Sequence, residues 1–392
     1  MFRRPACLIM LLLSLTVSGQ KISVRIYSHT KPSTFVFTPQ ACAYMLLTAG
    51  GDIITLKPGD PVIFSRHQES LVFKVPGLRT MVADTVTIVP EGNMDVFTVR
   101  QPANSEPPRN LSGRLKVYIY SGSVMILNIT DIESYLPGVV KAEAGTGGPS
   151  EYLRAQAVIA RTYVYRHLQR HTLDGYNLCD DVHCQAYSGL VSALSVREAC
   201  AGTAGEVLAD ADSVLIISAF HANCGGETAS SADTWVAAEP YLVSVTDTFC
   251  IHYKPVTWEK KIPAADWNRF LMSKGIEYNE DSLFAPATSL KPERVHDYII
   301  MGRHVPSADI RNYFNLKSTF FSFRKEADTL VITGRGYGHG VGLCQDGARA
   351  MAMKGMTYKD ITRFYYPGTS VINIKMHAYR QCRETYLNIF VI

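Results

Sequence analysis

The first long stretch of this chain alternates hydrophobic and polar residues with a period of two. Between positions 21 and 109 the alternating segments are rich in β-branched and aromatic residues, and glycine and proline separate them. Examples are residues 22–27, 62–64, 71–73 and 86–89. Side chains of a strand point alternately to opposite faces of a sheet, so this pattern predicts a series of short strands. We therefore expect a β-rich N-terminal region over residues 21–109.

A proline-containing connector at residues 102–108 separates this region from another alternating pair of segments. Residues 113–120 and 124–128 predict a β-hairpin whose turn is at residues 121–123. The period then changes at Thr130. The segment from Thr130 to Glu133 has the composition of a capping box and predicts a helix that ends near Glu143.

A second, longer helix is predicted to begin at Ser150, with Ser150 as its N-terminal cap. Its apolar stripe is spaced by three or four residues and consists of Leu153, Ala157, Ala160, Val164 and Leu168. Further on, the pattern predicts a strand at residues 213–220, a less regular insert at 255–324, a strand at 329–333 and a helix from Gln345 or Asp346 to Lys354. In the insert, the large aromatic residues expected in a core are Trp258, Trp267 and Phe270. Runs of strands combined with a few helices indicate an α+β fold.

The first 20 residues have the features of a secretory signal peptide. Arg3 and Arg4 precede an apolar run at residues 6–17, and small residues before Gly19 suit cleavage. The alternative is an uncleaved anchor, but the run is shorter than the roughly 20 residues that span a bilayer. We expect an exported protein of the periplasm or cell envelope, without a stable membrane span. The mature chain then divides into the N-terminal region, a second and larger domain at 110–375 that includes the insert, and a C-terminal tail at 376–392.

The composition of the chain limits the kinds of partner that it can bind. With 392 residues, of which 47% are hydrophobic and 19% charged, the chain can bury a large core. The formal net charge is +4, and the basic residues are scattered along the sequence, which argues against nucleic acid as a partner. Removal of the signal peptide leaves eight of the nine cysteines, and export permits disulfides among them.

Four segments carry side chains suited to chemistry. Glu143 ends an apolar helix, and apolar surroundings can raise the pKa of such a carboxyl and make it a general acid, although a solvated helix end is the plainer interpretation. The glycine-rich residues 334–348 let the backbone approach a ligand and leave three polar side chains: Tyr337, His339 and Gln345. Their spacing fits neither a P-loop nor a dinucleotide-binding motif. His221 and Asn223 lie at a strand end before two glycines, which is typical of a binding rim or of an ordinary corner.

The fourth segment places two histidines and two cysteines within a short span: His171, Cys179, His183 and Cys184. Thiolate and imidazole groups at this spacing suit a tetrahedral zinc site. In an oxidising compartment, a disulfide between Cys179 and Cys184 is the alternative. The spacing alone leaves both open.

Taken in order, these segments resemble the stage II sporulation protein D / LytB amidase-enhancer family. The resemblance runs from about position 113 to 369, and its most specific parts are residues 133–143, 155–163, 224–226, 338–342 and 364–368. The sequence differs from the usual pattern at Ala144, where methionine is common, and at Cys344, where serine is frequent.

The resemblance implies a lytic transglycosylase that cleaves the bond between N-acetylmuramic acid and N-acetylglucosamine in peptidoglycan glycan strands stripped of stem peptides. Glu143 occupies the position of the catalytic acid. The family positions expected around the substrate are Arg161, His221, Asn223, Tyr337, His339 and Gln345. Some members carry zinc, which favours a structural zinc ion over a disulfide at the cluster of histidines and cysteines. If a disulfide forms elsewhere, we expect it between Cys224 and Cys250.

Two other functions stay open from the sequence. The same family includes amidase enhancers, so the protein can instead be a noncatalytic module that binds the cell wall and stimulates a partner amidase. A zinc hydrolase is the third alternative, and it is disfavoured because two thiolate ligands leave no obvious open position on the metal.

Overall fold

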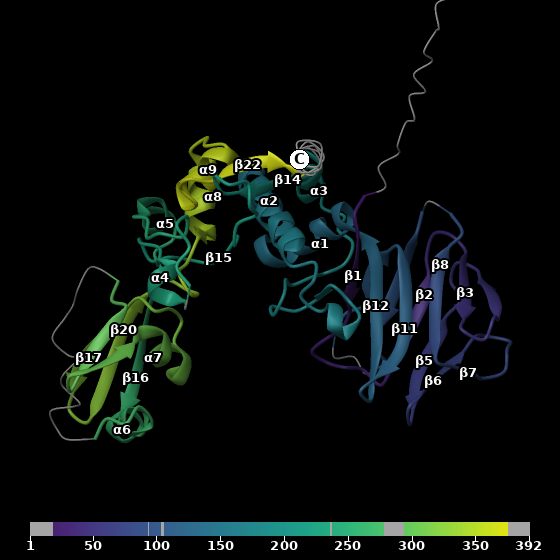
Figure 1. Ribbon diagram of the computed structural model, residues 1–392, viewed down its shortest axis with the longest axis horizontal. Coiled ribbons are helices and arrows are strands. Elements are labelled where there is room, and N and C mark those ends of the chain that lie inside the picture. The colour runs from purple at the N-terminus through teal and green to yellow at the C-terminus, as the bar shows by residue number, and fades with distance from the viewer. Residues whose placement is uncertain (1–18, 93, 103–105, 236, 278–293, 375–392) are drawn as a thin grey trace, which may run out of the picture.

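The computed structural model describes residues 19–92, 94–102, 106–235, 237–277 and 294–374. The predicted signal peptide lies outside the described residues except for its last two, and so does the predicted tail. Figure 1 shows three parts side by side: a β-sandwich, a central helical part and a smaller outer part. The α+β class predicted from the sequence is confirmed. Within the part of the chain that the structure describes, no helix is long and apolar enough to cross a membrane.

The β-sandwich consists of two sheets. The first is seven-stranded, in the order β13-β1-β12-β11-β8-β3-β4, and the second is six-stranded, in the order β10-β9-β2-β5-β6-β7. Their bounds are β1 Lys21–Arg25, β2 Thr34–Pro39, β3 Tyr44–Thr48, β4 Ile53–Leu56, β5 Val62–His67, β6 Ser70–Lys74, β7 Met81–Ala83, β8 Thr85–Pro90, β9 Val96–Arg100, β10 Arg109–Ser112, β11 Arg114–Tyr120, β12 Ser123–Asp131 and β13 Leu178–Cys179. Buried aromatic rings of the two sheets meet between them, as Phe37 of β2 does with Tyr44 of β3.

The predicted hairpin is confirmed as β11 and β12. Its outer neighbours come from the N-terminal region, because β12 pairs with β1 and β11 pairs with β8. The first sheet therefore extends across position 109, where the sequence suggested a boundary. It also includes β13, which pairs in parallel with β1.

The central part contains the longest helices. Its elements are α1 Ile132–Ala144, α2 Ser150–Arg166, a 3-10 turn at Thr172–Asp174, α3 Leu194–Ala201, β14 Glu206–Ala209, β15 Phe220–His221, α4 Ser231–Thr234, α5 Thr248–Tyr253, β21 Leu343–Cys344, α8 Gln345–Met353, α9 Tyr358–Tyr365 and β22 Ser370–Asn373. Strand β15 pairs in parallel with β21, and β14 pairs with β22. The helices predicted to end near Glu143 and to begin near Ser150 and Gln345 are thus confirmed.

The predicted helix caps are wrong. Thr130 belongs to β12, and the side chain of Asp131 caps α1 by accepting a hydrogen bond from the backbone N–H of Glu133. The Glu133 carboxylate is instead bound by Arg161. Pro149 precedes α2 at the cap position, and Ser150 is its first residue without a side-chain cap. Local sequence could not reveal these partners because Arg161 is 28 positions away from Glu133.

The strand predicted at residues 213–220 is reduced to an isolated bridge at Leu215 and the short β15. The apolar residues that suggested it pack into the core instead, as Ile216 does. Leu168, the last residue of the predicted stripe on α2, lies beyond the end of that helix.

The outer part is more regular than the sequence suggested. It consists of β16 Thr257–Pro263, α6 Ala264–Ser273, β17 Asp297–Ile300, β18 Arg303–Pro306, α7 Ser307–Phe314, β19 Phe321–Glu326 and β20 Thr329–Arg335. A separate hydrophobic core holds it together and contains Trp258, Trp267 and Phe270, as predicted. The central strand of this part, β20, pairs with both β16 and β19. The outer part is therefore held together largely by pairing between residues that are far apart in the sequence.

Candidate functional site

Glu143 lies in the last turn of α1 and is only partly exposed. Its Oε1 accepts a hydrogen bond from the backbone N–H of Ala186 at 2.9 Å. Burial raises the pKa of Glu143 above its usual value, and the hydrogen bond from Ala186 acts in the opposite direction. A carboxyl group with a raised pKa keeps its proton at a higher pH than an exposed glutamate, which is what a general acid needs.

The loop that carries Ala186 packs closely on α1. Both the backbone N–H and the hydroxyl of Ser188 donate to the carbonyl of Gly138, at 3.3 and 3.0 Å. The rings of Tyr187 and Tyr135 lie 4.6 Å apart, centroid to centroid. A Cβ at position 138 would approach the Gly189 carbonyl and the Tyr187 ring to under 3.0 Å. The glycine in this helix therefore lets the loop reach the carboxyl group of Glu143.

Helix α8 holds the same end of α1 through different atoms. The side-chain amide of Gln345 donates to the backbone carbonyl of Glu143 at 3.0 Å. The guanidinium of Arg349 donates to the carbonyls of Ala144 and Gly147 at 3.2 and 2.7 Å. The last carbonyls of a helix have no partner within the helix, so these bonds fix its end. Gln345, predicted to contact substrate, thus contacts the backbone of the predicted acid.

Two predicted histidines lie together near β15 and β21. The rings of His221 and His339 are 5.7 Å apart, and the ring of Trp235 lies 6.1 Å from that of His339. Burial lowers the pKa of His339 to about 4 and holds the pKa of His221 well below its usual value, so both are neutral at pH 7. Nδ1 of His221 lies 3.2 Å from the Val341 carbonyl, which assigns the proton to Nδ1. Among the described residues, its Nε2 has no hydrogen-bond partner and can accept one.

Asn223 and Tyr337 pair through their backbones, with N···O distances of 2.7 and 3.1 Å. The side-chain amide of Asn223 is buried and donates to the carboxylate of Asp346 at 2.9 Å and to the Lys254 carbonyl at 3.0 Å. The side chain of Tyr337 is 55% exposed. Of these two predicted substrate contacts, only Tyr337 presents its side chain to solvent.

Arg161 is fully buried, although its partner Glu133 is partly exposed. Its guanidinium forms two bonds of 2.8 Å with the carboxylate of Glu133 and donates to the carbonyls of Cys200 and Glu206 at 3.1 Å each. A contact with substrate would require these bonds to break. Arg161 therefore ties α1 to α2 and to β14, and we leave it out of the proposed site.

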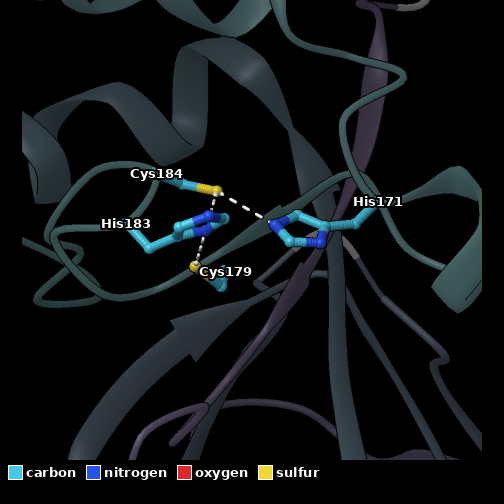
Figure 2. Close-up of side chains that lie close together, drawn as sticks. All are labelled: His171, Cys179, His183 and Cys184. Atoms are coloured by element: carbon cyan, nitrogen blue, oxygen red, sulfur yellow. Dashed lines mark hydrogen bonds between the residues drawn. The ribbon is translucent and has the colours of Figure 1, made fainter.

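The predicted metal-binding residues do come together. The ligand atoms of His171, Cys179, His183 and Cys184 all lie within 4.8 Å of one another. In Figure 2 the His183 ring lies between the two sulfur atoms. Nδ1 of His183 is 3.8 Å from each sulfur, and Nε2 of His171 is 3.4 Å from the sulfur of Cys184. Neither sulfur is part of a disulfide. Two thiolates and two imidazoles make a donor set that suits tetrahedral zinc. We call these four residues the Cys/His cluster.

The surroundings of the Cys/His cluster would also suit a bound metal. Nδ1 of His171 lies 3.1 Å from the carboxylate of Asp174, an arrangement that orients a metal-binding imidazole. The buried carboxylate of Asp180, next to Cys179, accepts hydrogen bonds from the backbone N–H groups of Tyr27 and Ser28 and pairs with Arg109. The cluster is thus attached to the β-sandwich on one side. On the other side, its chain continues directly into Ala186.

The predicted disulfide between Cys224 and Cys250 is not formed. Both residues are buried free thiols, and no cysteine that the structure describes forms a disulfide. The sulfur of Cys224 instead donates to the carboxylate of Asp247 at 3.2 Å, and the sulfur of Cys250 donates to the side-chain oxygen of Asn223 at 3.4 Å.

Comparisons with known proteins agree with the motifs. The family model described as Stage II sporulation protein matches residues 120–209. An uncharacterized protein of Brachyspira hyodysenteriae is 31% identical over 267 residues, which cover 67% of this chain and 72% of that protein. Stage II sporulation protein D of Bacillus subtilis is 26% identical over 324 residues, which cover 74% of this chain and 92% of that protein. The chain belongs to the stage II sporulation protein D family.

This chain is also similar to the amidase enhancer of Bacillus subtilis. The two are 28% identical over 291 residues, which cover 60% of this chain and 40% of that protein. The stretch that matches the family model contains Glu143, Ala186 and the whole Cys/His cluster. His221, His339 and Gln345 lie beyond it. Gln345, at the start of α8, contacts the backbone of Glu143, and His221 belongs to β15, which pairs with β21 directly before α8.

Two groups that contact the end of α1 were not predicted from the sequence. One is the backbone N–H of Ala186, which no side-chain pattern can reveal. The other is Arg349, whose role depends on α8 lying beside a helix some 200 positions earlier. Its spacing of four from Gln345, on one face of α8, was the available signal.

Proposed function

We propose that this protein acts on the bacterial cell wall as a peptidoglycan lytic transglycosylase, with Glu143 as its single acid and base. Its family supports a cell-wall-related function. The observation that carries the finer proposal is the partly buried carboxyl of Glu143, whose pKa burial raises and whose position Ala186 and Gln345 fix. The predicted signal peptide agrees with an exported protein of the periplasm or envelope.

In this reaction, Glu143 donates its proton to the glycosidic oxygen while the bond between that oxygen and the anomeric carbon of N-acetylmuramic acid breaks. The C6 hydroxyl of the same sugar attacks the anomeric carbon, and its proton passes to the Glu143 carboxylate. The product is a 1,6-anhydro sugar and the acid is restored. Because the nucleophile belongs to the substrate, one carboxyl group is sufficient.

Neutral polar groups near β15 and the glycine-rich loop are candidates to contact the hydroxyl groups and sugar rings of a glycan. The exposed ring of Tyr337 can pack against a sugar face. Nε2 of His221 is buried, so it can accept a bond from a sugar hydroxyl only if the residues that cover it move. The ring of His339 lies close to those of both His221 and Trp235, and its low pKa keeps it uncharged. Peptidoglycan strands freed of stem peptides are the substrate that we propose.

A structural zinc ion at the Cys/His cluster is part of this proposal. Zinc bound by four protein ligands is closed to substrate and would stabilise the loop that presents Ala186 to Glu143. Chelation should therefore lower the thermal unfolding temperature as well as the zinc content. A zinc-free protein of unchanged stability would contradict this assignment.

The second candidate function is a noncatalytic enhancer that binds the wall and stimulates a partner amidase. The relative named amidase enhancer favours it. Stimulation of an amidase by both the natural protein and Glu143→Gln, with no glycan products from either, would support this alternative over the enzyme.

The test of the proposed enzyme is mass spectrometry of products formed from peptide-free glycan strands. The natural protein should release anhydro-ended fragments, and Glu143→Gln should release none. Glu198→Gln is a matched control, because Glu198 is an exposed residue of α3. Equal product from Glu143→Gln and Glu198→Gln would disprove the role of Glu143.

A further inference from the structure

Three cysteines and an aspartate from separate segments meet in the core of the central part. The ligand atoms of Cys224, Asp247, Cys250 and Cys344 all lie within 4.8 Å of one another. All three sulfur atoms belong to free thiols, and all four residues are buried. We call them the three-cysteine cluster. The function proposed above does not use it.

The fold brings these residues together from three places. Cys224 follows β15, and Cys344 ends β21, which pairs with β15 in parallel. Asp247 caps the N-terminus of α5 by accepting a bond from the backbone N–H of Cys250 at 3.1 Å. The loop after β15 and the end of β21 thus supply one thiol each, and α5 with its cap residue supplies a thiol and a carboxylate.

Backbone N–H groups point at two of the sulfur atoms. Gly226 donates to the sulfur of Cys224 at 3.4 Å, and the N–H groups of Cys224 and Gly347 donate to that of Cys344 at 3.2 and 3.4 Å. Donors of this kind stabilise a thiolate over a thiol, and they orient metal ligands. Cys344 also caps α8, whose N-terminus favours negative charge.

The carboxylate of Asp247 is oriented as a ligand would be. The hydroxyl of Tyr365 donates to its Oδ2 at 2.7 Å. Its other hydrogen bonds come from the backbone N–H of Cys250 and the thiol of Cys224. These donors are all neutral. An ionised carboxylate buried among neutral groups is costly, and a bound dication removes that cost.

We propose that Cys224, Asp247, Cys250 and Cys344 form a second metal site, which binds zinc through three thiolates and one carboxylate. The donor set has the number and type of ligands found in closed structural zinc sites. A disulfide between any two of these cysteines is the competing state in an oxidising compartment. Such a disulfide would leave the third thiol and the Asp247 carboxylate without the bonds to a metal that zinc would provide.

The position of this zinc gives it a structural role. Asn223 precedes Cys224, and Gln345 follows Cys344, so the metal would hold β15, β21 and the start of α8 together. Gln345 donates to the backbone of Glu143. The three-cysteine cluster thereby supports the end of α1 without touching substrate.

The experiment measures zinc in the full chain, purified under reducing conditions and desalted into metal-free buffer. With the Cys/His cluster also filled, the natural protein should hold two zinc ions, one for each group of ligands. Cys250→Ser should hold one. Cys42→Ser, which replaces a partly exposed cysteine outside both clusters, should hold two.

A second measurement covers the case in which Cys250→Ser does not fold. X-ray absorption of zinc in the natural protein should give a mean sulfur number between two and three, since the Cys/His cluster offers two thiolates and the three-cysteine cluster three. A single zinc with two sulfur ligands would overturn the proposal. So would a peptide containing Cys224 joined to Cys250 by a disulfide in protein isolated from cells. Neither result depends on glycan cleavage, so the enzymatic proposal is tested separately.

Discussion

The Cys/His cluster and the three-cysteine cluster both support Glu143, but they do so through different atoms. The Cys/His cluster leads into the loop whose Ala186 N–H reaches the Glu143 carboxyl group. The three-cysteine cluster leads into α8, whose Gln345 holds the Glu143 backbone. The difference suggests a division of roles. We propose that the first controls the burial and pKa of Glu143, and that the second controls where the end of α1 lies.

The largest effect is expected from removing both thiols of the Cys/His cluster. Cys179→Ser combined with Cys184→Ser should lose zinc and destabilise the protein by more than about 4 kcal/mol, as losses of structural metals do. Chemical denaturation followed by fluorescence measures this change. Unchanged stability would show that the cluster does not support the fold.

A milder disturbance of the same loop should change the pH dependence of activity. Gly138→Ala forces a Cβ against the Gly189 carbonyl and the Tyr187 ring, at a cost of about 1–3 kcal/mol. Moving the loop away exposes Glu143 to water, and because burial is the larger cause of its raised pKa, that pKa should fall.

The direction of the expected shift in the pH profile follows from the role of Glu143 as an acid. Glu143 must be protonated to act, so activity is present below its pKa in the folded protein and is lost as the pH rises through it. In Gly138→Ala the alkaline limb of the rate profile should therefore move to lower pH. A limb that stays in place, or moves to higher pH, would contradict control of the pKa by this loop.

The matching change at the three-cysteine cluster is Gly347→Ala. A Cβ there would approach Oδ2 of Asp247 and the hydroxyl of Tyr365 to under 3.0 Å. We expect this overpacking to destabilise the protein by about 1–3 kcal/mol, as for Gly138→Ala. We expect a slower maximal rate with an unshifted alkaline limb. A pH profile that moves as far as that of Gly138→Ala would remove the proposed division of roles.

The smallest effect is expected for Gln345→Leu. It removes one hydrogen bond to the Glu143 carbonyl, worth about 0.5–1.5 kcal/mol of stability. If Gln345 positions the acid, the maximal rate should fall and KM should change little. An effect on KM alone would indicate that Gln345 instead contacts substrate, as the sequence first suggested.

The contrast between the clusters also explains what the sequence could reveal. His171, Cys179, His183 and Cys184 lie within 14 positions, so their spacing alone suggested a site. The three-cysteine cluster is assembled from positions up to 120 apart, and only the pairing of β15 with β21 brings them together. No local pattern singles out Asp247.

The same distinction applies to the fold and to the candidate active site. Helices α1, α2 and α8 and the hairpin could be predicted because their periods are local. In the outer part, the strand at 329–333 and the aromatic core residues were predicted, whereas the order of the insert was not, because β16 and β20 pair across about 70 positions. The position of Glu143 at a helix end was predictable, whereas the burial of Arg161 against Glu133 was not, since a helical stripe does not reveal which charged residue faces inward.

The most direct test of the central claim is digestion of peptide-free glycan strands in water labelled with oxygen-18. If Glu143 directs attack by the sugar's own C6 hydroxyl, the natural protein should release anhydro ends that carry no label, and Glu143→Gln should release nothing. Labelled reducing ends would show that water is the nucleophile. Unlabelled products from Glu143→Gln at the natural rate would show that another group is the acid.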